Sequence, residues 1–520
     1  MYLKNMNLKL NADYISNDEI VKKQLMEAIE MNDVILLVAP QGTGKSEFLK
    51  SLTRYTKLFI SPTISTAQQV EDSTDSVVTR GRSIYTFSIS GAIDRFNDPL
   101  TDITSSTFGS ADGIVNNALV DDYDVLIVDE VHKLVQYSTF GYNNISSAIN
   151  TIEEFIERGK KVILTTATAN LMYCLTESED FPKVDIAINI EVDKSYISEC
   201  IVLSGAQNKA LENLIAENKE EDNFQIVLYN NKDGIKKIAH ALQKKDIKAL
   251  SVNAEEYQEN SDKQKLVKDF KSGVYHGYSV LLATSWIDVG LNFNGDNITH
   301  LYCIFDSYYS NGDLTIIKQF MARARNSYPK LYINKPELSP QEKVLFDRIL
   351  DKDESTVKYD LEKLAYEIIE NYKKGYIKKL ECSHYYGLYQ KSKNTYDFSM
   401  ITLNYQLEKI YEKSRLLNDL ETELKKFLNI DKVSIKPRKL DELTNDEYVK
   451  LNSFAESAEE NETWYSIKEI SDILAEITTN RIIRQRPKQF INKNLDDYQL
   501  VDKNKSINGH SVKGYLIVKI

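Results

Sequence analysis

The chain lacks Cys-x-x-Cys pairs and long apolar runs. Its four cysteines are scattered through 520 residues without Cys-x-x-Cys spacing, so neither a zinc site nor a disulfide framework is indicated. No apolar run approaches the ~20 residues needed to cross a bilayer, and the first residues lack the apolar core of a secretory signal. We therefore expect a cytoplasmic protein without a membrane partner.

The chain also lacks an excess of positive charge. It has 65 Lys and Arg against 77 Asp and Glu, a net charge of −12. Net charge governs solubility and non-specific attraction, not the position of a local groove. The acidity therefore argues against a protein that passively coats nucleic acid, and it leaves a localised basic surface open.

Other bulk properties are ordinary. Hydrophobic residues make up 42% of the chain and charged residues 27%, as in a typical soluble globular protein. A length of 520 residues is too great for one core and predicts about three or four domains.

A phosphate-binding loop is predicted near the N-terminus. Residues 34–38 are an unbroken apolar run, as in a parallel strand buried on both faces. They lead into residues 39–46, Ala-Pro-Gln-Gly-Thr-Gly-Lys-Ser. Such a loop needs permissive glycines, a helix N-terminus behind them and a lysine that reaches the terminal phosphates. The predicted ATP-binding residues are Ala39, Gln41, Gly42, Thr43, Gly44, Lys45 and Ser46, and the Ser46 hydroxyl would also ligate Mg²⁺.

A pair of carboxylates follows a second buried-strand pattern. The apolar residues 125–128 run directly into Asp129-Glu130-Val131-His132. Two adjacent carboxylates at the end of a buried strand are costly unless a cation or a reacting water uses them. We interpret Asp129 as a Mg²⁺ ligand and Glu130 as the base that orients or deprotonates the attacking water. Together with the loop, they predict a site that binds ATP with Mg²⁺ and hydrolyses it.

With these two motifs the chain resembles the superfamily 2 helicases, in the DExH subgroup. Residues 59–63, 162–168 and 280–293 match further motifs of that family in the right order. The resemblance implies that His132 couples the nucleotide site to a second domain. It also implies contacts of Pro62, Thr63 and Thr284 with nucleic acid and of Gly290 with the nucleotide.

The sixth motif departs from the family's common form. That form is Gln-x-x-Gly-Arg-x-Gly-Arg, and residues 319–326 read Gln-Phe-Met-Ala-Arg-Ala-Arg-Asn. Gln319 and Arg323 match their positions, whereas Asn326 stands where the last arginine is usual. An Arg-x-Arg ending also occurs in the herpesvirus origin-binding helicases. The resemblance therefore implies that Arg323 and Arg325 are the arginine pair that completes the catalytic site.

The resemblance covers roughly residues 20–330 and implies an α/β fold. We expect two tandem RecA-like domains with parallel sheets, at residues 1–195 and 196–335. Residues 336–455 are predicted to form a helical accessory domain, because apolar positions recur there at helical spacing. Five tyrosines of this segment are open to two interpretations, packing between helices or stacking on bases. They are Tyr372, Tyr376, Tyr385, Tyr386 and Tyr389.

Residues 456–520 are predicted to begin with an acidic linker, residues 456–462, and to continue as a winged helix. Ser466 with Glu469 is a capping-box signature for a first helix. A basic second helix would carry Arg481, Arg484, Arg486 and Lys488, and two strands around Asn508-Gly509 would form a hairpin that carries Lys513. The ending resembles the wing of many phage primase-helicases.

The charge of this last segment favours contact with phosphates. Residues 478–520 contain nine Lys or Arg and three Asp or Glu, a net charge of +6 in an acidic protein. A basic helix with a basic wing suits nucleic acid, although a winged helix used for protein contacts remains an alternative.

The sequence thus predicts an ATP-dependent DNA helicase or translocase that acts in the replication of a phage or mobile element. Expected partners are nucleic acid, DNA rather than RNA, and replication proteins, and we expect a monomer or weak oligomer. Two alternatives stay open: an RNA helicase of the same superfamily, and an origin- or partner-binding protein in which ATP acts only as a switch.

Overall fold

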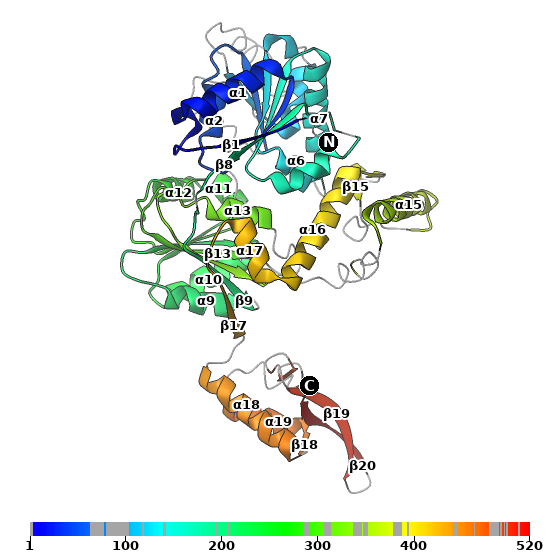
Figure 1. Ribbon diagram of the computed structural model, residues 1–520. Helices are drawn as coiled ribbons and strands as arrows, with labels where there is room; N and C mark the ends of the chain where they lie inside the picture. Colours follow the sequence, from blue (N-terminus) through cyan, green and yellow to red (C-terminus); the bar gives the residue numbers. More distant parts are fainter. Residues whose placement is uncertain are drawn as a thin grey trace.

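The computed structural model describes most of the chain. The described residues are 4–62, 77–79, 103–116, 119–138, 142–179, 181–193, 195–204, 208–284, 287, 291–305, 314–335, 346, 352–377, 387–392, 395–439, 445–461, 463–477, 488, 491–492, 495, 498–507 and 510–519. Figure 1 shows two sheet-bearing domains and a smaller C-terminal domain. Within the described ranges, no helix is long and apolar enough to cross a membrane.

The first domain is built on an eight-stranded sheet in which every pairing is parallel. The strands are β1 (Lys4–Lys9), β2 (Val34–Val38), β3 (Lys57–Ser61), β4 (Val77–Thr79), β5 (Ile103–Thr107), β6 (Val125–Val128), β7 (Lys161–Thr166) and β8 (Ile186–Glu191). Their order in space is β1-β8-β2-β7-β6-β3-β5-β4. The phosphate-loop strand β2 and the carboxylate strand β6 therefore both lie beside β7, and their carboxyl ends meet at one edge of the sheet, where ligands of α/β folds bind.

Both faces of this sheet are buried, which explains the unbroken apolar runs. Along β2, Val34 and Leu36 belong to one core cluster, whereas Ile35 and Leu37 belong to a cluster on the opposite face. The helices of the domain are α1 (Glu19–Met31), α2 (Lys45–Lys50), α5 (Asp112–Asn116), α6 (His132–Tyr137), α7 (Tyr142–Glu157) and α8 (Met172–Thr176).

The second domain repeats the plan with a seven-stranded parallel sheet. Its strands, in spatial order, are β11 (Ala249–Val252), β12 (Val280–Ala283), β10 (Phe224–Tyr229), β13 (Ile298–Ile304), β14 (Lys330–Asn334), β9 (Glu199–Ser204) and β17 (Val433–Lys439). Its helices include α9 (Asn208–Glu217), α10 (Lys232–Gln243), α11 (Ala254–Glu259), α12 (Ser261–Lys271) and α13 (Leu314–Met321). The predicted pair of tandem RecA-like sheets is confirmed.

The third segment differs from the predicted helical domain at 336–455. Strand β17 pairs in parallel with β9 and completes the second sheet. Helices α16 (Met400–Asn418) and α17 (Leu420–Leu428) place Leu416, Leu424 and Leu428 in the core of the second domain. The segment is thus neither wholly helical nor separate, because its apolar residues cover the edge and face of the second sheet.

The first part of that segment packs on α16, where Val357 shares a small core with Leu403 and Leu407. It holds helix α15 (Glu354–Lys373) and a two-stranded antiparallel sheet of β15 (Leu388–Ser392) and β16 (Thr395–Phe398). Tyr372 packs edge to face on Tyr396 and Tyr389 is buried, as the packing interpretation expects, whereas Tyr376 is exposed. Tyr385 and Tyr386 lie outside the described residues.

The acidic stretch 456–462 is not the linker that its composition predicted. Residues 445–460 form helix α18, in which Leu451, Ala455 and Ala458 are buried in the core of the C-terminal domain. These three positions recur at helical spacing and face the core, so the acidic residues between them can remain in water. The C-terminal domain therefore begins at α18, before the predicted boundary.

The rest of this domain contains helix α19 (Ile467–Ile477) and an antiparallel sheet, ordered β18 (Trp464–Ser466), β20 (His510–Lys519), β19 (Tyr498–Ile507). The predicted capping box is confirmed, since the Ser466 N–H donates to Glu469 Oε2 at 2.8 Å and the Glu469 N–H to Ser466 Oγ at 3.2 Å. The hairpin pairing is confirmed too, with Ile507 opposite His510. Arg481, Arg484 and Arg486 lie outside the described residues.

Candidate nucleotide site between the two domains

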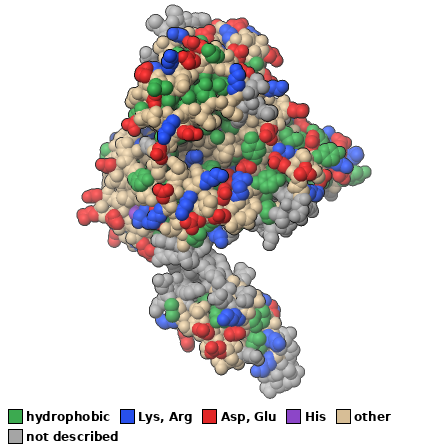
Figure 2. All heavy atoms as spheres, viewed as in Figure 1, with side chains coloured by type: hydrophobic (Ala, Val, Ile, Leu, Met, Phe, Trp, Pro, Cys, Tyr) green, Lys and Arg blue, Asp and Glu red, His purple; other side chains and the backbone are tan. Residues whose placement is uncertain are grey.

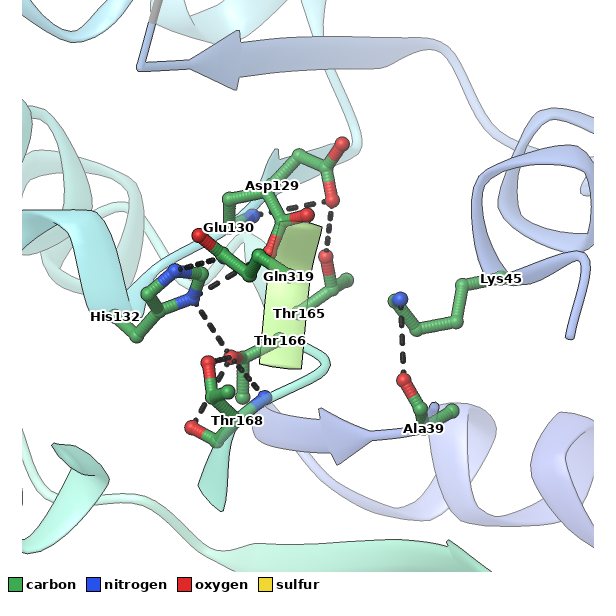
Figure 3. Close-up of polar contacts among 9 residues, drawn as sticks. All are labelled: Ala39, Lys45, Asp129, Glu130, His132, Thr165, Thr166, Thr168 and Gln319. Atoms are coloured by element: carbon green, nitrogen blue, oxygen red, sulfur yellow. Dashed lines mark hydrogen bonds and ion pairs between the residues drawn. The ribbon is translucent and has the colours of Figure 1, made fainter. Parts of the chain in front are cut away.

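The phosphate loop enters helix α2 through two glycines with left-handed backbone. Gly44 is the residue before the helix, with φ 81°, and Gly42 has φ 78°. The loop is tied to its surroundings, because the Thr43 hydroxyl donates to Pro40 O at 2.8 Å. The Lys45 ammonium donates to Ala39 O at 3.1 Å. The Lys45 side chain thus folds back over its own loop, and its ammonium group lies near the carboxyl ends of the strands (Figure 3).

Arg325 of the second domain lies directly over this loop. A Cβ added to Gly42 would stand 2.2 Å from one of the terminal guanidinium nitrogens of Arg325, so only glycine admits that approach. Asn292 Oδ1 accepts hydrogen bonds from Arg325 Nε at 3.1 Å and from its other terminal nitrogen at 2.9 Å. Arg323 also donates to Asn292 Oδ1, at 3.4 Å. One amide oxygen therefore orients both arginines.

The guanidinium of Arg325 is largely buried, and its surroundings would suit the binding of an anion. Burial lowers the pKa of Arg325, while the nearby Tyr196, Tyr14 and Glu130 raise it. The hydroxyl of Tyr196, which lies between the two sheets in the chain, donates to the backbone oxygen of Gln41. Burial raises the pKa of Tyr196, and the nearby Arg325 opposes the shift; the protonated hydroxyl is the donor in this hydrogen bond.

The carboxylate pair stands at the end of β6. Asp129 Oδ1 accepts the Thr165 hydroxyl at 2.6 Å and the backbone N–H of Glu130 at 3.1 Å. Burial and the neighbouring Glu130 raise the pKa of Asp129, and Lys45 opposes them. Glu130 has φ 52°, a left-handed conformation that costs a residue other than glycine about 1–2 kcal/mol. Strain of this kind is typical of functional sites.

His132 joins the two domains. Gln319 Nε2, from α13 of the second domain, donates to His132 Nε2 at 2.6 Å. The proton of the imidazole is then on Nδ1, which lies 2.9 Å from Thr166 Oγ1 and 3.4 Å from Glu130 Oε2. Thr166 Oγ1 in turn accepts the N–H of Thr168 at 2.9 Å. Figure 3 shows this chain of contacts from Gln319 through the imidazole to the carboxylate strand and to β7.

The residues present fit a divalent cation. Asp129 and Glu130 are adjacent carboxylates. Glu130 Oε2 is buried and, apart from the ionic contact with His132 Nδ1 at 3.4 Å, has no hydrogen-bond partner among the described residues. Within the described ranges, no cluster of three His, Cys, Asp or Glu could hold a metal alone. Magnesium usually takes one or two protein ligands together with phosphate oxygens and water, so this donor set suits a metal that arrives with a nucleotide.

The structure brings most of the predicted nucleotide-site residues together and leaves others elsewhere. Thr284 is buried at the end of β12 and Pro62 follows β3. Lys488 and Lys513 lie in the C-terminal domain, where Asp502 pairs with both, at 2.5 Å and 3.8 Å. Thr63 and Gly290 lie outside the described residues.

Two residues of the site were missed by the sequence prediction. Asn292 lies inside the predicted fifth motif, and its position two residues after Gly290 was the available signal. Tyr196 gave no signal, because a lone tyrosine before a strand is ordinary. Its contact with the phosphate loop depends on how the chain passes between the two domains.

Comparison with known families gives a match over part of the first domain. The family model of the DEAD/DEAH box helicases matches residues 20–173. This stretch is similar to the DEAD/DEAH box helicases. The matched stretch includes the phosphate loop, the carboxylate pair and the threonines of β7. The match ends before the second sheet, so the part played by Gln319, Arg323 and Arg325 rests on the contacts described above.

Several solved structures that are similar to this chain are helicases. Comparison with curated protein sequences gave no match. Mycobacterium smegmatis helicase Lhr bound to ssDNA and AMP-PNP is 15% identical, with a TM-score of 0.45 over 66% of this chain and 49% of that one. The chain thus spans about half the length of Lhr. S. cerevisiae Dbp5 bound to RNA and ADP BeF3 is 12% identical, with a TM-score of 0.44 over 63% and 90%. The Pyrococcus furiosus Hef helicase domain is 14% identical, with a TM-score of 0.37 over 64% and 98%.

Proposed function

We propose that the protein is an ATP-dependent DNA helicase or translocase of the DExH subgroup of superfamily 2. The observation that carries the proposal is the contact between Gln319 and His132, together with the position of Arg325 over Gly42. A hydrolysis site in one domain thereby receives polar groups from the other. Opening and closing of the two domains can then follow the state of the nucleotide.

Each residue has a distinct role in this proposal. Lys45 would leave the Ala39 carbonyl to neutralise the terminal phosphates, and Glu130 would orient and deprotonate the attacking water. Arg323 and Arg325 would stabilise the charge on the transferred phosphoryl group. Ser46 and Asp129 would hold Mg²⁺, which would supply positive charge to neutralise the phosphates.

DNA is the proposed substrate because of the C-terminal domain. This domain carries the basic segment of the chain, and in its described part Lys505 lies over the Trp464 ring at 5.6 Å. Acidic and basic side chains are intermingled on the visible face of the two sheet-bearing domains, and also on the described part of the C-terminal domain (Figure 2). We propose that this domain is a winged helix that contacts phosphates, and that the protein serves replication of a phage or mobile element, as the similarity of its ending to phage primase-helicases suggests.

The proposal is tested by ATP turnover with single-stranded DNA, duplex DNA and RNA in parallel. Stimulation by DNA is expected. Stimulation by RNA alone would favour an RNA helicase. If no nucleic acid stimulated turnover, the protein would be an ATP-switched binding protein instead.

Removal of residues 445–520 is expected to weaken binding of duplex DNA by tenfold or more, because counterion release at several Lys and Arg contacts would be lost. The C-terminal domain has its own core, and β17 ends before it, so unstimulated ATP turnover should persist. Fluorescence anisotropy at two salt concentrations measures the affinity, and the truncated protein should show a shallower salt dependence. Unchanged affinity would remove this domain from DNA binding.

A further inference from the structure

Helix α16 packs on both sheet-bearing domains. Near its start, Ile401 belongs to the core of the first domain. Near its end, Leu416 belongs to the core of the second. Figure 1 shows α16 running from the neighbourhood of α6 to α17 beside α13. A helix buried at both ends in this way fixes the distance between the two domains along its length.

Polar contacts tie the first half of α16 to the first domain. The Thr402 hydroxyl donates to the backbone oxygen of Ser138 at 3.1 Å. The Tyr173 hydroxyl, on α8, donates to Glu408 Oε2 at 2.7 Å, and Arg415 donates to Glu408 Oε1 at 2.8 Å. Both carboxylate oxygens of Glu408 are therefore occupied, which offsets the cost of its burial.

One turn further on, Glu412 contacts the second domain. Its Oε1 accepts the backbone N–H of Leu314 at 3.1 Å, and the residue is only 2% exposed. Leu314 is the first residue of α13, where N–H groups have no partner within the helix. Glu408 and Glu412 are four residues apart and so share one side of α16. One carboxylate holds α8 of the first domain, and the other holds the start of α13.

Helix α13 carries the groups that the second domain brings to the nucleotide site. Gln319 reaches His132 from its last turn, and Arg323 and Arg325 follow its end. Thr315, in the first turn, accepts a hydrogen bond from Asn170 of the first domain at 3.4 Å. Asn170 and His132 thus hold α13 against the first domain. Glu412, at the start of α13, opposes a shift of the helix along its axis.

We infer that Glu412 is a positioning residue for ATP hydrolysis. By accepting the first N–H of α13, Glu412 determines where Gln319 and the two arginines lie relative to the carboxylate pair. Glu408 fixes α16 to the first domain, so the position of α13 follows that of the first domain. This inference rests on the proposed ATPase. It concerns the step of hydrolysis and not the binding of nucleotide, because the phosphate loop belongs to the first domain.

Three substitutions at Glu412 separate geometry from charge. Glu412→Gln keeps an oxygen acceptor at the same reach, and we expect a kcat close to that of the wild type. Glu412→Asp keeps the charge but withdraws it by one methylene, and Glu412→Ala removes the acceptor. Because misplacement by ~1 Å can cost ~100-fold in rate, we expect kcat to fall by roughly 10- to 100-fold in both. The dissociation constant for ADP should stay at the wild-type value in all three.

The measurement is DNA-stimulated ATP turnover as a function of ATP concentration, with ADP binding and thermal melting measured on the same samples. Glu421→Ala on the neighbouring α17 is the control, since that side chain is 51% exposed and pairs with Lys425. Wild-type turnover in the Asp and Ala variants would overturn the inference and leave the proposed function intact. A higher kcat in Glu412→Asp than in Glu412→Gln would overturn it too. That result would show that the charge of the side chain matters and the position of its oxygen does not. A wild-type protein that hydrolyses no ATP would refute the proposed function itself.

Discussion

Replacement of Glu130 by glutamine is expected to lower DNA-stimulated ATP turnover by roughly 10²–10⁴-fold, the usual contribution of a general base. The amide keeps the shape of the side chain but cannot take a proton from water. ATP binding should survive, because the phosphate loop and Lys45 are untouched. Glutamine also keeps an oxygen acceptor at the same reach for the 3.4 Å contact with His132 Nδ1, so the change should cost little stability.

Steady-state turnover and equilibrium binding of a fluorescent ATP analogue test this prediction together. Glu47→Gln is the matched control, since Glu47 is on the phosphate-loop helix, 68% exposed and paired with Lys50. The control should retain turnover. If Glu130→Gln hydrolysed ATP at the wild-type rate, another group would have to be the base.

Replacement of Arg325 by alanine is expected to produce the second large effect. An arginine that stabilises the transferred phosphoryl group contributes roughly 10³–10⁵-fold in rate in the best cases. Arg325→Lys should not restore it, because an ammonium lacks the planar fork that Asn292 orients through two hydrogen bonds. The loss should appear in kcat, with nucleotide binding weakened much less.

Asn326→Ala is the informative comparison for Arg325. Asn326 stands where the family's common sixth motif has its last arginine, but its side chain donates only to the backbone oxygen of Asn294 at 2.8 Å and lies at the surface. We expect this variant to hydrolyse ATP normally. A large loss in Asn326→Ala together with normal turnover in Arg325→Ala would show that the arginine pair was wrongly assigned.

The parts predictable from the sequence are those that local chemistry determines. The two apolar runs before the phosphate loop and the carboxylate pair required parallel strands buried on both faces, and β2 and β6 are such strands. Ser466 and Glu469 formed the expected capping box because both partners lie within one helical turn.

The predictions that were wrong concern segments whose structure depends on contacts with residues far away in the sequence. Strand β17 pairs with β9, which lies more than 200 residues earlier in the chain. The sequence of residues 433–439 does not indicate which strand they pair with. The acidic residues of 456–462 suggested a linker, but the buried Leu451, Ala455 and Ala458 make the segment a core helix. The acidic composition reflects the side of the helix that faces water. Only the spacing of the three buried residues indicates that the other side packs in a core.

The same distinction applies within the site. Lys45, Asp129 and Glu130 could be selected by type and position alone. The contact of Tyr196 with the loop and that of Glu412 with α13 arise only when the two domains and α16 come together. Such residues belong to no short motif, so their chemistry becomes visible only in three dimensions.

We propose that the two domains share one site for ATP hydrolysis and that nucleic acid stimulates this hydrolysis. The most direct test is ATP turnover by the wild type and by Lys45→Ala, each with and without single-stranded DNA. The account predicts turnover that DNA stimulates in the wild type and that is absent from Lys45→Ala under both conditions. Turnover in Lys45→Ala at the wild-type rate, or wild-type turnover that DNA leaves unchanged, would contradict it.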